Sequence, residues 1–367
     1  MLKPVVLLIC LLAAFVGCST TSRRAGEADN QDWSDAGKTN LPLAELEHVP
    51  EGPQLAAPAG DLPEPFKPHP VVTAATTWVP ADRWSRENNF GTLRATALAP
   101  APAFVLTSAQ GLLTFQAKSL LARWNGQEFH LGFEPQMVVG QPVVHALDLE
   151  KNFKPLFRPF EIPTRANRVI VLDPGHGGRN AGTESVLGNG NEKEFTLDWA
   201  RRLGRLLATN GWQVRLTRTN DADVALSNRV AFAESEHADV FVSLHFNSSA
   251  PGREQAGLET YCLTPAGMPS TLKRGYEDDA GLVFANNAFD EQNFQLALKV
   301  QRALVKGAGI GDRGVRRARF LGVLRGQNRP AILIEGGYLS NPNEARRIAD
   351  PAYRQKLAEA VAGALLH

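Results

Sequence analysis

The chain has 367 residues, of which 43% are hydrophobic and 21% are charged, so it has enough apolar residues for a sizeable core and is not disordered throughout. Its formal net charge of +1 gives no electrostatic reason to expect nucleic acid as a partner. The three cysteines are too few for a disulfide framework or a thiolate zinc site, so the chemistry must come from histidines, carboxylates or hydroxyls.

Residues 1–18 are typical of an export signal. Lys3 precedes an apolar run, 5–16, that is shorter than the roughly 20 residues a membrane-spanning helix needs. The run ends in Phe15-Val16-Gly17-Cys18, which resembles the processing site of bacterial lipoproteins. We therefore expect an exported protein of the periplasm or cell envelope, with a lipid on Cys18 that would attach it to the outer membrane. Ordinary signal cleavage and a membrane-anchoring first helix are the alternatives.

Residues 19–70 are predicted to be a linker. Between residues 25 and 66 there are nine acidic residues against one lysine, and prolines recur from Pro42 onward. Such a segment has too little apolar surface to fold, and a Pro-rich chain stays extended. A domain that follows it would not be confined to the membrane surface.

Residues 76–150 are expected to form a small β-rich domain of unknown role. Short apolar or alternating runs predict strands, at 104–106, 112–115, 120–124, 128–133 and 138–144. Asn125-Gly126 between two of these runs is a strong hairpin signal. We expect Trp78, Trp84 and Trp124 in the core of this domain, the alternative being an aromatic face that binds glycans.

Residues 166–367 alternate strand and helix patterns. Strands are predicted at 168–173, 212–217, 239–244, 258–263 and 331–334, and helices at 192–208, 226–236, 294–306 and 351–366. This alternation is typical of an α/β fold with a mainly parallel sheet flanked by helices.

Three of these strands end in residues that can bind a metal or transfer a proton. The strand at 168–173 leads to His176, the strand at 239–244 to His245, and the strand at 331–334 to Glu335. Ligands of open α/β sheets bind beyond the carboxyl ends of the strands. We therefore expect these three side chains to lie together at one edge of the sheet.

A fourth candidate stands at the start of the helix at 192–208. Asn191 and Glu194 have the spacing of a capping box, which assigns Glu194 to the helix end. Glu192 instead shares the helix face of Phe195 and Trp199, which is predicted to pack on the sheet. A carboxylate on that face needs a partner, and a metal is one; the alternative is that Glu192 only complements the helix dipole.

His176, Glu192 and His245 together make a set of two histidines and one carboxylate. That set is typical of catalytic zinc sites, which keep a fourth position open for water. Glu335 is then free to act as a general base at the same edge.

The motifs around these residues resemble those of the zinc-dependent N-acetylmuramoyl-L-alanine amidases, which cut bacterial peptidoglycan. They are Asp173-Pro174-Gly175-His176-Gly177-Gly178, Glu192-Lys193, Ser243-Leu244-His245-Phe246-Asn247 and the run from Ile334 to Asn341. The resemblance spans about residues 168–366. It implies one Zn²⁺ held by His176, Glu192 and His245, and a catalytic role for Glu335. Residues 264–292 match the family less well, and in some relatives an insert in this region blocks the site.

The resemblance predicts hydrolysis of the amide between N-acetylmuramic acid and the L-alanine of the stem peptide. A peptidoglycan-binding or regulatory lipoprotein is the alternative from another class, and the presence of Glu335 favours the enzyme. A zinc carboxypeptidase that acts on stem peptides is a second alternative. The sequence at His176 argues against it, because it contains no His-x-x-Glu pair of ligands. The predicted partners are peptidoglycan and, through Cys18, a membrane; no protein activator is identified.

Overall fold

The computed structural model describes residues 77–96, 102–160, 167–273 and 278–366. The predicted signal, Cys18 and the linker lie outside these ranges. Within the described ranges, no helix combines the length and the apolar character that crossing a bilayer requires.

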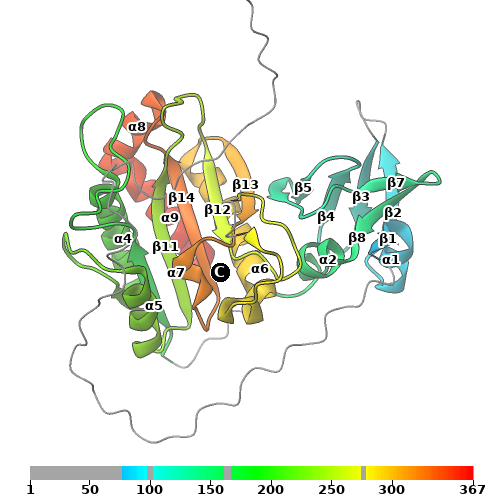
Figure 1. Cartoon of the computed structure of the whole chain (residues 1–367), viewed down its shortest axis with the longest axis horizontal. Helices are drawn as coiled ribbons and strands as arrows, with labels where there is room; N and C mark the ends of the chain where they lie inside the picture. The colour runs from blue at the N-terminus through cyan, green and yellow to red at the C-terminus, as the bar shows by residue number, and fades with distance from the viewer. Residues whose placement is uncertain (1–76, 97–101, 161–166, 274–277, 367) are drawn as a thin grey trace, which may run out of the picture. The chain divides into compact units, whose positions relative to one another are not determined.

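A mainly parallel sheet lies at the centre of the C-terminal region (Figure 1). Its parallel strands are, in spatial order, β10 (Gln213–Leu216), β9 (Val169–Pro174), β11 (Val240–Asn247) and β14 (Ala331–Tyr338). Beyond β14, β12 (Leu258–Cys262) pairs with it antiparallel and then pairs parallel with β13 (Asp312–Arg317). The predicted α/β fold is therefore confirmed.

Helices cover both faces of this sheet. Successive side chains of its buried strands point to opposite faces, so each face has its own hydrophobic core. Ile170 and Leu172 pack with Trp199 and Leu357 on one face, whereas Val171 packs in a second cluster on the other face. The first face carries α4 (Glu192–Ala208), α6 (Asp290–Ala308) and α9 (Pro351–Leu366). The second carries α5 (Leu226–Ser235) and α7 (Gly322–Arg325), while α8 (Pro342–Ala349) follows β14.

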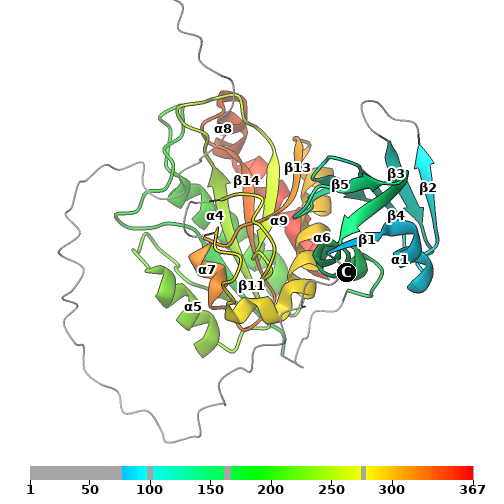
Figure 2. The ribbon, with the colours of Figure 1, turned by 45° about the vertical axis from the view of Figure 1, so that its right-hand side comes forward.

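The N-terminal β-rich region continues the same sheet. An antiparallel meander runs through β2 (Thr92–Thr96), β3 (Ala103–Thr107), β4 (Leu112–Gln116), β5 (Leu121–Trp124) and β6 (Gln127–His130). Strand β6 pairs with β13 through Val315 and Phe129, so the meander extends the central sheet. Figure 2 shows strands β2 to β5 of the meander. Asn125 and Gly126 both have positive φ, as the predicted hairpin requires.

A second, three-stranded sheet completes the β-rich region. It consists of β1 (Trp78–Pro80), β8 (Gln141–His145) and β7 (Gln136–Val138). The single strand predicted at 138–144 is wrong, because the chain turns at Val139-Gly140 and splits it into β7 and β8. Short helices that were not predicted from the sequence complete this region: α1 (Ala81–Glu87), α2 (Ala146–Asp148), the π-helical turn η2 (Leu149–Phe153) and α3 (Lys154–Leu156). Helix α1 contacts β1 and β8, whereas η2 and α3 contact α6.

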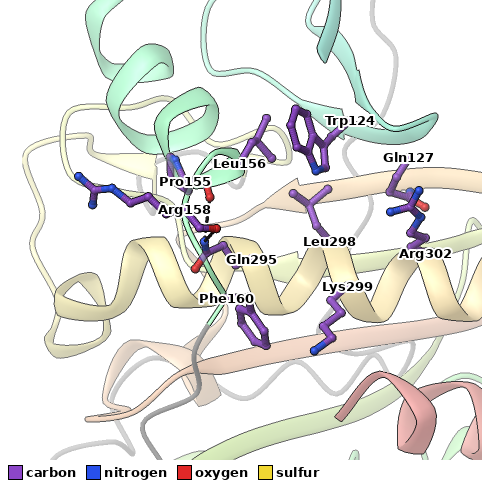
Figure 3. Close-up of a pocket in the computed structure, with 10 residues that line it drawn as sticks. All are labelled: Trp124, Gln127, Pro155, Leu156, Arg158, Phe160, Gln295, Leu298, Lys299 and Arg302. Carbon is purple, nitrogen blue, oxygen red and sulfur yellow. Dashed lines mark hydrogen bonds between the residues drawn. The ribbon is translucent and has the colours of Figure 1, made fainter. Parts of the chain in front are cut away.

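The two regions share one hydrophobic core. Phe129 of β6 packs edge-on against Phe294 of α6, with ring centroids 5.4 Å apart. Trp84 and Trp124 are half-buried against this core, while half-buried Trp78 packs on His145. Where α3 and the β5–β6 hairpin meet α6, a cavity of about 190 Å³ remains (Figure 3). The division into a β-rich and a C-terminal domain stays a prediction.

Candidate metal centre

A glycine-rich turn after β9 presents His176. His176 has φ +62°, and Gly177 and Gly178 also have positive φ, so the chain reverses through a left-handed segment that disfavours residues with a side chain. The Nδ1 atom of His176 lies 2.8 Å from Oδ1 of Asn180. This contact leaves Nε2 directed at Glu192, 3.1 Å from its Oε1 atom.

Glu192 lies at the first position of α4 and links the two histidines. Its Oε1 atom is 3.0 Å from Nδ1 of His245 and also accepts the backbone N–H of Phe246. Its Oε2 atom accepts the N–H of Thr183. One donor atom from each of His176, Glu192 and His245 falls within 4.8 Å of the others. The structure thus brings together the three side chains proposed from the sequence.

The neighbouring residue Glu194 has the separate role that the spacing predicted. Its carboxylate accepts the backbone N–H of Asn191, 3.3 Å away, at the start of α4. Glu194 is exposed, whereas Glu192 is buried. The two glutamates therefore face opposite sides of the helix, and only Glu192 reaches the histidines.

Burial and the charges of the neighbouring side chains together shift the pKa values of all three side chains. Burial disfavours ionised Glu192, but His176 and His245 outweigh this effect and lower its pKa. Burial would lower the pKa of His176, but the Glu192 carboxylate raises it above the ordinary value. For His245 burial dominates, and its pKa is lowered. The centre therefore holds an ionised carboxylate between two imidazoles that differ in basicity.

A buried ion pair beneath the turn fixes the position of His176. The carboxylate of Asp173 accepts hydrogen bonds from Arg229, Thr217 and Ser243 at 2.6, 2.6 and 2.7 Å. Arg229 also donates to the carbonyl oxygen of His176, 2.7 Å away. Arg229 was not predicted from the sequence, because it lies on α5 and no motif around it indicates that it pairs with Asp173.

Glu335 lies beside these ligating atoms on the neighbouring strand. It is paired in register with His245 across β11 and β14, and residues paired in this way project from the same face of the sheet. Its side chain is fully buried, and neither carboxylate oxygen has a hydrogen-bond partner in the described structure. Burial, with the negative charges of Glu192 and Glu259, raises its pKa well above the ordinary value.

The surroundings of the three ligating side chains fit a zinc ion. Two imidazoles and one carboxylate are the donors that Zn²⁺ accepts in catalytic sites. Space around them is tight: a Cβ atom on Gly182 would lie 2.7 Å from Glu192 and His176, and one on Gly175 would lie 2.2 Å from the His245 ring. Glycine at both positions keeps room for the histidines, and the nearby carboxyl group of Glu335 has no hydrogen-bond partner among the described residues.

The described part of segment 264–292 is attached to the body of the domain. Arg319 pairs with Asp278 and donates to the carbonyl oxygens of Pro265 and Met268. Among the described residues, the group of ligating atoms contains His176, Glu192 and His245 and no side chain from this segment.

Known proteins resemble the C-terminal region. The model of the N-acetylmuramoyl-L-alanine amidase family matches residues 170–367. The amidase AmiA of Escherichia coli is 31% identical over 216 residues, which cover 53% of this chain and 74% of AmiA. The amidase LytC of Bacillus subtilis is 33% identical over 52% of this chain and 34% of LytC. The crystal structure of an N-acetylmuramoyl-L-alanine amidase from Clostridium difficile 630 aligns with a TM-score of 0.46 and 32% identity, covering 55% of this chain and 96% of that chain.

Proposed function

The chain belongs to the N-acetylmuramoyl-L-alanine amidase family, and we propose that it is a zinc-dependent hydrolase of peptidoglycan. The bond cut is the amide between the lactyl group of N-acetylmuramic acid and the L-alanine of the stem peptide. The observation that carries this proposal is the meeting of His176, Glu192 and His245 beside the unpartnered carboxyl group of Glu335. A binding protein would have no use for a buried carboxyl group in that position.

In this proposal His176 binds the zinc ion through Nε2, His245 through Nδ1 and Glu192 through Oε1. These are the atoms that converge in the structure, and Asn180 orients the His176 ring from its other nitrogen. The bound ion would supply a Lewis acid that activates a water molecule and polarises the amide carbonyl.

Glu335 is proposed as the general base and acid. It accepts the proton of the attacking water and then donates a proton to the departing nitrogen of L-alanine. Its raised pKa in the metal-free chain suits the donating half of this role, because it keeps a proton on the carboxyl group. A bound cation nearby would favour the ionised carboxylate, which is the form that accepts the proton of the water. Arg229 and Asp173 do not touch the reacting atoms; they hold the His176 turn in place.

The place of action is also a proposal. The predicted export signal and the lipid on Cys18 would deliver the enzyme to the periplasmic or cell-envelope side of a membrane, next to peptidoglycan. Replacing Cys18 by Ala is expected to move the full-length protein from the membrane fraction to the soluble fraction. Membrane association of the Cys18→Ala variant at the wild-type level would refute the lipid anchor.

The activity is tested by incubating the zinc-loaded protein with purified sacculi and analysing the products by mass spectrometry. We expect released stem peptides that begin with a free L-alanine amine, and glycan strands that keep the lactyl carboxylate. Release of single amino acids from the peptide end would instead identify a carboxypeptidase. Binding to sacculi without release of peptides would identify a binding protein.

A further inference from the structure

A row of charged side chains continues from the candidate metal centre across the sheet. His245 on β11 is paired with Glu335 on β14, and Glu335 is paired with Glu259 on β12. Arg313 and Arg316 follow on β13, with their Nε atoms 2.6 and 3.1 Å from Oε1 of Glu259. Strands are spaced about 4.8 Å apart, so the backbone of β13 lies two strands, or roughly 10 Å, from that of β14. The arginine side chains reach back across part of this separation, since their Nε atoms contact Glu259 on the strand between.

Glu259 is a buried carboxylate that holds this end of the row together. Besides the arginines, its Oε2 atom accepts hydrogen bonds from Nδ2 of Asn247 at 2.9 Å and from the hydroxyl of Tyr261 at 2.7 Å. Asn247 follows His245 by two residues on β11. The arginines are thereby tied to the strand that carries one of the candidate ligands.

The charge of this cluster is not balanced. Two guanidinium groups contact the single carboxylate of Glu259, so these three side chains together carry one positive charge in excess. The carboxyl group of Glu344 also interacts with Arg313. The side chains of Arg313 and Arg316 are 26% and 20% exposed, whereas that of Glu259 is 2% exposed. The cluster therefore buries its negative charge and leaves its two arginine side chains partly exposed, and guanidinium groups form strong hydrogen bonds with anions.

The β-rich region borders this cluster. Nδ1 of His130 on β6 lies 3.3 Å from the carbonyl oxygen of Val315 on β13. Burial and the positive charge of Arg316 lower the pKa of His130 to about 4. His130 is therefore neutral at pH 7, and the positive charge beside it belongs to the arginines.

We propose that Arg313 and Arg316 form a subsite for a carboxylate of the stem peptide, with Glu259 as the residue that positions them. This inference rests on the proposed function.

In the intact substrate the N-acetylated sugars are uncharged and the lactyl carboxyl group is part of the amide bond, so the ionised carboxylates belong to the stem peptide. An extended peptide advances about 3.4 Å per residue, so the backbone separation of roughly 10 Å is at most about three residues long. The carboxylate bound would lie on the second or third residue after the scissile amide. The planar guanidinium group matches a carboxylate with two parallel hydrogen bonds.

The test uses the full-length zinc-loaded protein and soluble muramyl tripeptides. One substrate has free α-carboxylates on its second and third residues, and two matched substrates carry a carboxamide at one or the other position. We expect wild-type kcat/KM to fall at least tenfold with one of the two carboxamides. Arg313→Gln and Arg316→Gln are each expected to reduce this discrimination to threefold or less, with the loss on the free-acid substrate appearing in KM. Arg316→Lys keeps the charge and should recover part of the discrimination.

Controls separate this subsite from the proposed function and from a general structural effect. Arg302→Gln removes an exposed arginine of α6, and it should leave the discrimination at the wild-type level. Thermal unfolding of each variant checks that the fold is retained. Equal losses on all three substrates, or wild-type discrimination in both Gln variants, would overturn the subsite. Failure of the wild type to release an L-alanine amine from any substrate would refute the proposed function instead.

Discussion

Glu335 on β14 and Glu259 on β12 occupy directly paired positions in the sheet, yet their carboxyl groups have opposite surroundings. Both side chains are almost completely buried. Glu259 meets two arginines, an amide and a hydroxyl, whereas neither oxygen of Glu335 has a partner in the described structure. One glutamate of the pair is therefore held by charged and polar partners, and the other carries a buried carboxyl group without a hydrogen-bond partner among the described residues.

The metal-free protein should be stabilised by Glu335→Gln at pH 7. Because the pKa of Glu335 is raised in the folded chain, the folded state keeps a proton that the unfolded state releases above its ordinary pKa. The wild type therefore loses stability as the pH rises from the ordinary glutamate pKa toward the raised pKa of folded Glu335, and the variant does not. The difference in the free energy of unfolding between the variant and the wild type should therefore grow with pH. It should grow by up to about 1.4 kcal/mol for each pH unit between the ordinary glutamate pKa and the raised pKa of folded Glu335.

Glu259→Gln serves as the matched control for this prediction. It removes the partner of Arg313 and Arg316 and should destabilise the metal-free chain by about 2–3 kcal/mol at pH 7. Urea unfolding in the presence of a chelator, at pH 5 and at pH 7, measures both effects. An advantage of Glu335→Gln that does not grow with pH would contradict the raised pKa.

In the zinc-loaded protein, Glu335→Gln should keep the metal and lose turnover. The amide has the size of the carboxyl group but cannot accept the water proton, and general acid–base catalysis typically contributes about 10²–10⁴-fold. Glu192→Gln should lose the metal as well, since an amide is a poorer ligand than a carboxylate. Zinc content by elemental analysis and peptide release from sacculi separate the two. Normal turnover by zinc-loaded Glu335→Gln would show that this residue is structural.

Asp173→Asn should weaken the metal centre without removing a ligand. The substitution leaves buried Arg229 without its anionic partner, which typically destabilises a protein by about 3–5 kcal/mol. Arg229 also holds the carbonyl oxygen of His176, so zinc affinity should fall by about 10–100-fold, as for other groups that orient metal ligands. Competition with a chromogenic chelator measures the affinity. Unchanged zinc binding in a folded Asp173→Asn variant would exclude this supporting role.

Much of the C-terminal fold follows from local patterns in the sequence. Helix α4 has the predicted bounds, 192–208, because an apolar stripe and the Asn191 cap coincide there. The apolar runs before His176, His245 and Glu335 indicate strands, and parallel strands bring their carboxyl ends to one edge. Strands β11 and β14 continue further than predicted, through His245 and Glu335. These patterns are local, so they could be read without knowledge of the rest of the chain.

Features that depend on distant partners could not be predicted in this way. Strand β13 was missed because Asp312–Arg317 is mostly charged, and its arginines are accommodated only by groups such as Glu259 and Asn152 elsewhere in the chain. The continuation of the sheet into β6 has the same cause, since nothing near Phe129 indicates its pairing with Val315. At the candidate metal centre, Arg229 could not be predicted for the same reason, because its partners Asp173 and His176 lie more than 50 residues away in the sequence.

The last prediction concerns two glycines with the same backbone conformation. Gly182 and Gly188 have φ of +67° and +66°, so alanine at either position suffers the same left-handed strain, on the order of 1 kcal/mol. A Cβ atom at Gly182 would lie 2.7 Å from Glu192 and from His176, whereas one at Gly188 would have no atom within 4 Å. Gly182→Ala must therefore displace two of the candidate ligands, and Gly188→Ala need not.

We expect both variants to lose similar stability from backbone strain. Only Gly182→Ala should also lose zinc affinity and turnover, each by tenfold or more. Thermal unfolding with chelator, zinc titration and peptide release from sacculi provide the comparison. Because Gly188→Ala controls for the backbone, equal zinc affinity in the two variants would mean that His176 and Glu192 do not hold the metal together.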